Sequence, residues 1–352
     1  MFFTAQPTSC LLRACSAILL ELSRSKRRSP GRRRGGYIDC HCHISAGDFD
    51  KDLEDVIERS KQAGLLALLA VAEHAGEFEK IISLSHRFPG FIFPCLGVHP
   101  VQEVSPEQQR GASLQDLDAA LPIIEKYKDH LVAIGEVGLD FTPRFVNNET
   151  DKDSQRQVLI RQAQIAKQLD LPLNVHSRSA GRPTIHLLKE QGVEKALLHA
   201  FDGKPSVAME GVKAGYFFSI PPSIVRSEQQ KLVKQLPLEN ICLETDSPAL
   251  GPEKQVRNEP QNIPISAEYI SKIKGVSLEK VMEVTTQNAL RLFPKIKAES
   301  ACASAINSEE ISRRGKAAAA AGKCSSHKDF SVGVTRTAPW RLTRWSGGVS
   351  PG

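Results

Sequence analysis

The segment Tyr37-Ile38-Asp39-Cys40-His41-Cys42-His43 is the starting point for predicting the fold and the site. It is typical of a short strand. Because side chains alternate along a strand, we expect Asp39, His41 and His43 on one face and Cys40 and Cys42 on the other, facing covering helices. Two imidazoles placed two residues apart can bind one metal ion together. The pair alone is a weak signal, so its meaning depends on ligands from the rest of the chain.

Residues 37–296 alternate apolar, β-rich runs with helical patterns eight times. Such runs predict parallel strands that are buried on both faces, and eight units predict an α/β protein with a single (β/α)8 TIM barrel. An open doubly wound sheet is the alternative, but no glycine-rich phosphate loop follows the first strand. The predicted strands are 37–40, 65–72, 91–98, 131–137, 171–176, 196–201, 216–220 and 241–244. The predicted helices are 50–62, 77–87, 114–127, 155–169, 183–190, 205–213, 228–235, 267–274 and 278–293.

Both ends differ in composition from the predicted barrel. Residues 1–36 carry eight Lys/Arg and one acidic residue, and residues 297–352 carry nine Lys/Arg and four acidic residues. The whole chain has a net charge of +6, so the segment between the two ends has a net charge of −6. We expect a basic, disordered extension at 1–36 and a low-complexity, disordered tail at 297–352. The basic character of the whole chain therefore does not describe the folded part.

The composition predicts an intracellular, soluble protein. No stretch reaches the roughly 18 uncharged apolar residues that a membrane-spanning helix needs, so no membrane partner is expected. The eight scattered cysteines, four of them in the two tails, favour a reducing compartment. The Arg- and Ser-rich start suits a nuclear or cytoplasmic protein or a mitochondrial transit peptide, and a disordered N-terminus without a targeting role is the alternative.

Side chains that can bind a metal follow the predicted strands. In a barrel of this type the C-terminal ends of the strands meet at one rim, where the chemistry takes place. We therefore expect side chains that are distant in the chain to converge on one metal site. The candidates are His41, His43, His99, Glu136, His176, His199 and Asp246.

Six motifs follow one another along the chain: residues 39–43 (DCHCH), 97–100 (GVHP), 135–140 (GEVGLD), 172–178 (PLNVHSR), 198–203 (LHAFDG) and 244–248 (ETDSP). In order and spacing this set resembles the TatD-type metal-dependent deoxyribonucleases, which belong to the amidohydrolase-like metallo-barrels. The resemblance covers residues 37 to about 294. Ala200 and Asp202 replace the usual Cys and Ser or Thr, the 251–260 loop has fewer basic residues than is usual, and the extension before the first strand is uncommon.

The resemblance implies a site with two metal ions. Asp246 would bind metal and accept the proton of the attacking water, and Glu136 would bridge the ions, so these two are the predicted catalytic residues. Glu244 is expected to orient a histidine. The implied ligands are His41, His43 and Asp246 for one ion, His176 and His199 for the other, and Glu136 for both. The implied substrate contacts are His99, Arg178, Lys254, Arg257 and Asn258, with a structural salt bridge or loop hydrogen bond as the alternative for each.

Four histidines and two carboxylates favour Zn2+ by ligand type and also suit Mn2+, while members of the family are usually described with Mg2+. We expect a deoxyribonuclease that acts as a 3′-exonuclease, with incision at abasic sites as a second activity. The acidic barrel favours DNA ends or single strands over broad duplex binding, and no obligate protein partner is evident. A related metallo-barrel hydrolase of small amides, lactones or phosphate esters is the first alternative. A non-enzymatic binding role is the second.

Overall fold

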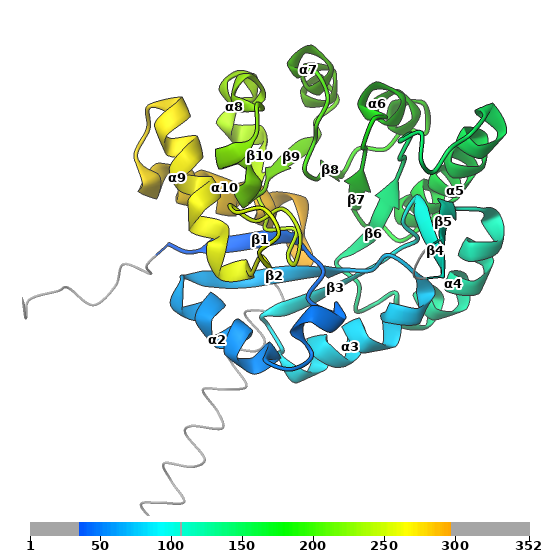
Figure 1. The fold of residues 1–352 in the computed structure, drawn as a ribbon, viewed down its shortest axis with the longest axis horizontal. Helices are drawn as coiled ribbons and strands as arrows, with labels where there is room; N and C mark the ends of the chain where they lie inside the picture. Colours follow the sequence, from blue (N-terminus) through cyan, green and yellow to red (C-terminus); the bar gives the residue numbers. More distant parts are fainter. Residues whose placement is uncertain (1–34, 106–107, 297–352) are drawn as a thin grey trace, which may run out of the picture. The chain divides into compact units, whose positions relative to one another are not determined.

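A computed structural model of the chain describes residues 35–105 and 108–296. Eight parallel strands form one nearly closed barrel in the order β1-β2-β3-β6-β7-β8-β9-β10, which confirms the predicted fold. Figure 1 shows the helices on the outside of these strands. The barrel strands are β1 (Tyr37–Cys42), β2 (Leu65–Val71), β3 (Ile92–Leu96), β6 (Ala133–Gly138), β7 (Leu173–His176), β8 (Ala196–Leu198), β9 (Phe217–Ile220) and β10 (Ile241–Leu243).

Each barrel strand is followed by at least one helix, as the alternating pattern predicts. The ends of the predicted elements move by a few residues, and the largest change is at α5, which begins six residues earlier than predicted. Its first turns are polar and carry no apolar period, but the Asn148 side chain accepts a hydrogen bond from Asp151 N and so caps the start. The helices are α2 (Leu53–Gln62), α3 (Phe78–Arg87), α4 (Leu114–Tyr127), α5 (Glu149–Gln168), α6 (Gly181–Glu190), α7 (Pro205–Lys213), α8 (Gln230–Gln235), α9 (Ile263–Lys274) and α10 (Leu278–Leu292).

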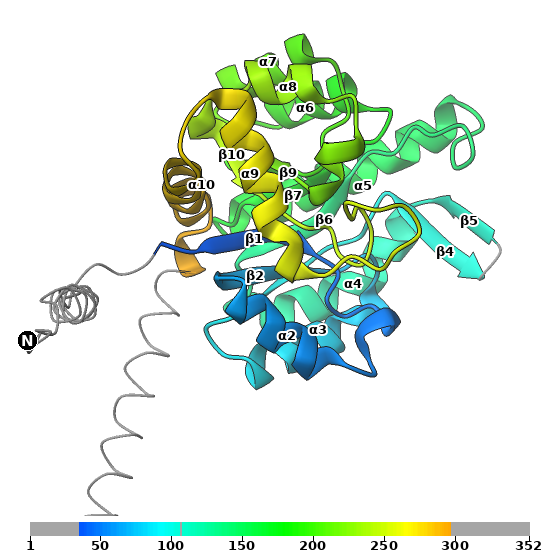
Figure 2. The same ribbon diagram turned by 60° about the vertical axis from the view of Figure 1, so that its left-hand side comes forward.

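A two-stranded hairpin between β3 and α4 was not predicted. It consists of β4 (Val101–Ser105) and β5 (Gln108–Gly111), which pair antiparallel. Its sequence is mostly polar, so it lacks the alternation that would reveal a half-buried strand. Figure 2 shows the hairpin projecting to one side of the barrel.

The core has two parts. Side chains on the outer faces of the strands pack against the helices in one large cluster. A second cluster fills the barrel interior with residues such as Leu69, Phe93 and Leu197, and only α10 among the helices contributes to it, through Ala289 and Leu292. This packing gives the strands a rigid frame, so that their C-terminal ends hold side chains at fixed distances.

Strand β1 departs from simple alternation. Its pairing with β2 shifts register between Asp39 and Cys42, as an irregular or bulged strand does. Cys40 lies in the interior cluster whereas Cys42 lies in the outer one, so the expectation that both face the helices is wrong for Cys40. The Asp39 carboxylate accepts hydrogen bonds from Thr245 N at 2.9 Å and Thr245 Oγ1 at 2.5 Å, and it thereby ties β1 to the segment after β10.

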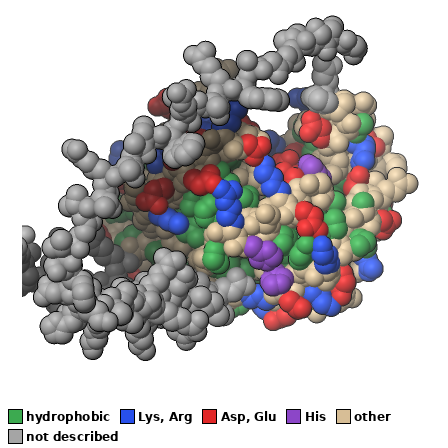
Figure 3. Space-filling view, turned by 90° about the horizontal axis from the view of Figure 1, so that it is seen from below, with side chains coloured by type: hydrophobic (Ala, Val, Ile, Leu, Met, Phe, Trp, Pro, Cys, Tyr) green, Lys and Arg blue, Asp and Glu red, His purple; other side chains and the backbone are tan. Residues whose placement is uncertain are grey.

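The predicted extension at 1–36, apart from Gly35 and Gly36, and the predicted tail at 297–352 lie outside the described residues. Within the described part, no helix is long and apolar enough to cross a membrane. On the face in Figure 3, acidic and basic side chains of the described residues are interspersed, and the basic ones form no continuous area there.

Candidate metal centre

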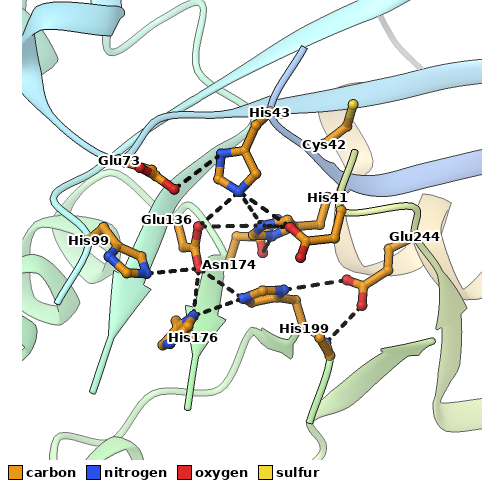
Figure 4. A network of polar contacts seen from close by, with 12 residues as sticks. His41, Cys42, His43, Glu73, His99, Glu136, Asn174, His176, His199 and Glu244 are labelled. Atoms are coloured by element: carbon orange, nitrogen blue, oxygen red, sulfur yellow. Dashed lines mark hydrogen bonds and ion pairs between the residues drawn. The ribbon is translucent and has the colours of Figure 1, made fainter. Parts of the chain in front are cut away.

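The six predicted metal ligands converge at one end of the barrel. His41 and Glu136 lie within β1 and β6, and His176 ends β7. The others follow strands: His43 directly after β1, His199 directly after β8, and Asp246 three residues after the end of β10. Figure 4 shows the labelled histidines around Glu136, with Cys42 directed away from them. The chain order of the strands therefore assembles the cluster, because parallel strands end at the same rim.

Glu136 is the centre of the cluster and is buried. Its Oε2 lies 3.4 Å from His41 Nε2 and 3.3 Å from His43 Nε2. Its Oε1 lies 2.8 Å from His199 Nε2 and 2.9 Å from His176 Nδ1. Burial opposes ionisation, but the surrounding histidines hold the pKa of Glu136 well below its usual range. The two carboxylate oxygens thus face two separate pairs of imidazoles.

Asp246 completes the half of the cluster that contains His41 and His43. Its Oδ1 lies 3.4 Å from His41 Nε2 and 3.3 Å from His43 Nε2. Its backbone has φ 52°, in the left-handed region that costs a non-glycine residue energy, and its N–H donates to His41 O at 2.9 Å. The loop after β10 holds this conformation, since Asn258 Nδ2 donates to Thr245 O and Asn258 N donates to Pro248 O.

The outer nitrogens of two histidines show that the cluster fits divalent cations. Asn174 Nδ2 donates to Cys40 O, so its Oδ1 must accept from His41 Nδ1 at 2.8 Å. His176 Nε2 is likewise 3.1 Å from Asp140 Oδ2. With their protons on these outer nitrogens, both rings direct lone pairs at the oxygens of Glu136. In their neutral form these rings suit a cation, and binding it would displace the protons of rings such as His43 and His176, whose pKa values the neighbouring carboxylates raise despite burial.

His199 and Glu244 form a further pair behind the cluster. His199 Nδ1 lies 3.7 Å from Glu244 Oε2 and has no hydrogen-bond partner among the described residues. Glu244 accepts hydrogen bonds from Ala200 N and from Ser219 Oγ, and burial raises its pKa to about 8. Burial, and next the neighbouring His41, lower the pKa of His199 to about 4, so this ring is neutral and able to bind metal. Glu244 thus lies beside His199 without a hydrogen bond to it, and its role in orienting a histidine stays a prediction.

A cavity of about 440 Å³ opens above the cluster, and two of the predicted substrate contacts border it. His99 Nε2 lies 3.5 Å from Glu136 Oε1, so His99 stands beside the ligands and can also complete a metal site with Glu136 and His176. Its Nδ1 is near both N and O of Val101, which is compatible with either tautomer. Arg178 is exposed at the cavity wall, and its side chain forms no ion pair within residues 35–105 and 108–296.

The other three predicted substrate contacts lie in the loop after β10. Lys254 is exposed there. Asn258 is buried and holds the loop through the bonds to Thr245 and Pro248 described above. Arg257 donates to Asp52 and Glu259 at 2.7 Å and packs over the Phe49 ring. For Asn258 and Arg257 the structure therefore shows a loop hydrogen bond and a structural salt bridge, which were the alternatives to a substrate contact.

Arg257 provides a test of that alternative. We expect Arg257→Ala to lower the melting temperature by a few degrees, because the loop loses its ion pairs to Asp52 and Glu259. We expect the KM for single-stranded DNA to stay within about twofold, since the guanidinium is already paired. Thermal melting and steady-state kinetics measure the two effects. A large rise in KM at unchanged stability would instead support a phosphate contact.

Asp140 and Asn174 hold the rings of His176 and His41, and the sequence-based prediction assigned neither a role. A signal for Asn174 exists, because it lies two residues before His176 on the same strand and therefore on the same face. Asp140 lies four residues after Glu136, just beyond β6, but only the tertiary structure shows that it reaches His176 from the neighbouring strand.

Replacing Asp140 by Asn should weaken metal binding by about 10- to 100-fold, because the amide cannot stabilise the proton on His176 Nε2 as a carboxylate does. Chelator competition on the folded protein measures the affinity without relying on activity. Asp153→Asn, at an exposed position in the first turns of α5, serves as the matched control. An unchanged affinity in Asp140→Asn would show that the carboxylate does not support the metal-binding ring.

The chain is similar in sequence to proteins of one family. The family model described as TatD related DNase matches residues 38–294. The human protein named Deoxyribonuclease TATDN3 is 73% identical over 263 residues, which are 74% of this chain and 96% of the relative. A Bacillus subtilis protein, the uncharacterized metal-dependent hydrolase YabD, is 32% identical over 73% of this chain and 98% of its own length.

The solved structures agree with the family model. The crystal structure of YJJV, a TatD homologue from Escherichia coli, superposes with a TM-score of 0.65 at 25% identity, covering 73% of this chain and 98% of that one. A TatD family hydrolase from Entamoeba histolytica has the same fold, with a TM-score of 0.64 at 24% identity over 74% of this chain and 98% of that one. The match over the whole barrel shows that the chain belongs to the TatD-related DNase family of metal-dependent hydrolases.

Proposed function

We propose that this protein hydrolyses phosphodiester bonds of DNA with two divalent metal ions bound at the cluster. The observation that carries the proposal is the position of Glu136, whose two oxygens face different pairs of histidines. His41, His43 and Asp246 would hold one ion and His176 and His199 the other, with Glu136 shared between them. The ligand types favour Zn2+ and also suit Mn2+, while Mg2+ prefers a site richer in oxygen.

The residues of the chain supply the rest of the chemistry. When bound, a pair of divalent ions would neutralise charge on the phosphate and lower the pKa of a water molecule. Asp246 holds one oxygen toward His41 and His43, and its other oxygen is available to accept the proton of the attacking water. Arg178 at the cavity wall would bind a phosphate oxygen, and His99 next to Glu136 would lie beside the leaving group.

The charge of the barrel favours DNA ends and single strands as substrates. The barrel segment is acidic, with a net charge of −6 for residues 37–296. A non-specific duplex binder neutralises several phosphates at once and needs a basic surface. We therefore propose 3′-exonuclease action, with incision at abasic sites as a second activity of the same centre.

The proposal is tested with single-stranded DNA labelled at its 5′ or 3′ end, in metal-free protein to which Zn2+, Mn2+ or Mg2+ is returned. We expect cleavage only with added metal, with loss of single nucleotides from the 3′ end, and no product from His41→Ala or Asp246→Ala. A duplex with one abasic site tests incision separately. If no metal supports product formation that these variants lack, the nuclease proposal fails.

We further propose that residues 37–296 form the working domain. Removing residues 1–34 and 297–352 should then leave turnover on labelled single-stranded DNA within about twofold of the full chain, since every candidate ligand lies in the barrel. The cut after residue 34 keeps Gly36, whose carbonyl accepts a hydrogen bond from Thr286 Oγ1. Turnover of the full and shortened chains at equal concentration measures this, and a large loss would show that the tails take part.

A further inference from the structure

A second cavity, which we call the side cavity, adjoins the cavity of about 440 Å³ that opens above the ligand cluster. It has a volume of about 240 Å³ and lies beyond the ends of β8 and β9, next to α8 and the short helix Pro222–Arg226. His176, Arg178 and His199 line both cavities, so a molecule bound at the metal ligands can extend into the side cavity. The volume is below the roughly 300–1,000 Å³ of sites for drug-sized ligands, which suits a single small unit.

One wall of the side cavity is apolar and rigid. Phe201, Ile224 and Leu232 line it and are nearly fully buried. The Phe201 ring is held on two sides, because a Cβ added at Gly181 would lie 2.8 Å from the ring and one added at Gly203 would lie 2.5 Å from it. An aromatic ring fixed in this way gives a base or sugar a preformed apolar surface.

The polar groups of the side cavity indicate a neutral ligand with hydrogen-bonding groups. Ser177 lines the cavity, and its buried Oγ has no hydrogen-bond partner among the described residues. Asp202 places a carboxylate at the wall, while the single lysine or arginine among the lining residues is Arg178, where the two cavities meet. A phosphate would therefore be repelled by Asp202 and favoured beside Arg178 and the metal ligands.

We propose that the side cavity binds the deoxynucleoside next to the scissile phosphate, with its base or sugar against Phe201 and its phosphate between Arg178 and the metal ligands. This inference rests on the proposed phosphodiester hydrolysis and adds a subsite that selects nucleotides over simple phosphate diesters. Ser177 Oγ and the Asp202 carboxylate supply hydrogen bonds to the polar edge of the nucleoside.

Two chromogenic diesters with the same leaving group test the subsite: thymidine 5′-(4-nitrophenyl phosphate) and methyl 4-nitrophenyl phosphate. The variant Ser227→Trp fills the side cavity from an exposed lining position. Val225→Trp is the matched control, because Val225 is exposed in the same segment but does not line the cavity. Equilibrium dialysis of thymidine 5′-monophosphate against each protein adds a measurement that needs no turnover.

We expect the wild type to prefer the thymidine ester by at least about tenfold in kcat/KM, as contact with a nucleoside provides. Ser227→Trp should remove most of this preference and weaken thymidine 5′-monophosphate binding, while the rate on the methyl ester stays within about twofold. Val225→Trp should behave as the wild type does. Each of three results would overturn the subsite. In the first, Ser227→Trp lowers kcat/KM equally on both esters. In the second, the two tryptophan variants have equal effects, and in the third, the wild type does not prefer the thymidine ester.

The experiment separates this inference from the proposed function. If the wild type hydrolyses both esters equally, the phosphodiesterase proposal stands and the subsite falls. If it hydrolyses neither ester with any added metal, the proposed function fails, and dialysis decides the subsite alone. The subsite is supported if Ser227→Trp weakens binding of thymidine 5′-monophosphate and Val225→Trp does not. It is overturned if the wild type does not bind the nucleotide, or if both variants bind it equally well.

Discussion

Replacing Glu136 by Gln should abolish turnover and release metal at the same time. Glu136 is buried and is the single residue whose oxygens reach both halves of the described ligand cluster. The amide keeps the shape of the side chain but loses the charge, and its NH2 group would face imidazole nitrogens from which a metal needs lone pairs. We expect kcat to fall by at least about a thousandfold, because charge stabilisation by two metals contributes several kcal/mol.

Metal analysis of the purified variant by mass spectrometry, together with kinetics on labelled single-stranded DNA, measures both effects. Glu103→Gln is the matched control, because Glu103 is an exposed residue of β4 that lines the same cavity without contacting the histidines. Circular dichroism confirms that both variants fold. A Glu136→Gln protein that keeps its metal and its activity would show that Glu136 does not bridge the ions.

Replacing Asp246 by Asn should separate catalysis from metal binding. The amide oxygen can still face His41 and His43, and these rings and Glu136 remain to hold the ion. The amide cannot accept the proton of the attacking water, so we expect kcat to fall by about 10²- to 10⁴-fold. Most of the metal should stay bound, in contrast to Glu136→Gln.

The same metal analysis and kinetics distinguish the two roles of Asp246. Glu253→Gln is the control for this variant, since Glu253 is exposed in the loop that follows β10 and is not among the candidate ligands. If metal content in Asp246→Asn fell in proportion to activity, Asp246 would act as a ligand only. Activity close to that of Glu253→Gln would exclude it from both roles.

Much of the fold was predictable from local pattern. Parallel strands buried on both faces read as apolar runs, and helices of a barrel show a clear 3.6-residue period, so both signals survive in a single sequence. The hairpin β4–β5 and the first turns of α5 were missed, because polar segments are ordered there by pairing and capping and not by an apolar face. The irregularity of β1 was missed for a related reason, since register depends on the partner strand.

The clustering of the candidate ligands was predictable because a barrel converts order along the chain into position at one rim. The strand pattern and residue type together select six residues that lie in the last three positions of a strand or shortly after one: His41, His43, Glu136, His176, His199 and Asp246. Strand pattern and residue type do not determine the roles of the substrate-binding candidates. Arg257 and Asn258 are close in sequence to Asp246, but their partners determine what they can contact, and those partners come from other segments.

By itself the sequence determined the barrel, the candidate ligands and the family, because apolar period and strand-end residue types are local properties. Only the tertiary structure showed that each oxygen of Glu136 faces a different pair of histidines, that Asp140 and Asn174 hold the outer nitrogens of His176 and His41, and that a side cavity adjoins the site. These features depend on distances between side chains from different strands. Such distances are set by packing of the whole barrel, which no local stretch of sequence encodes.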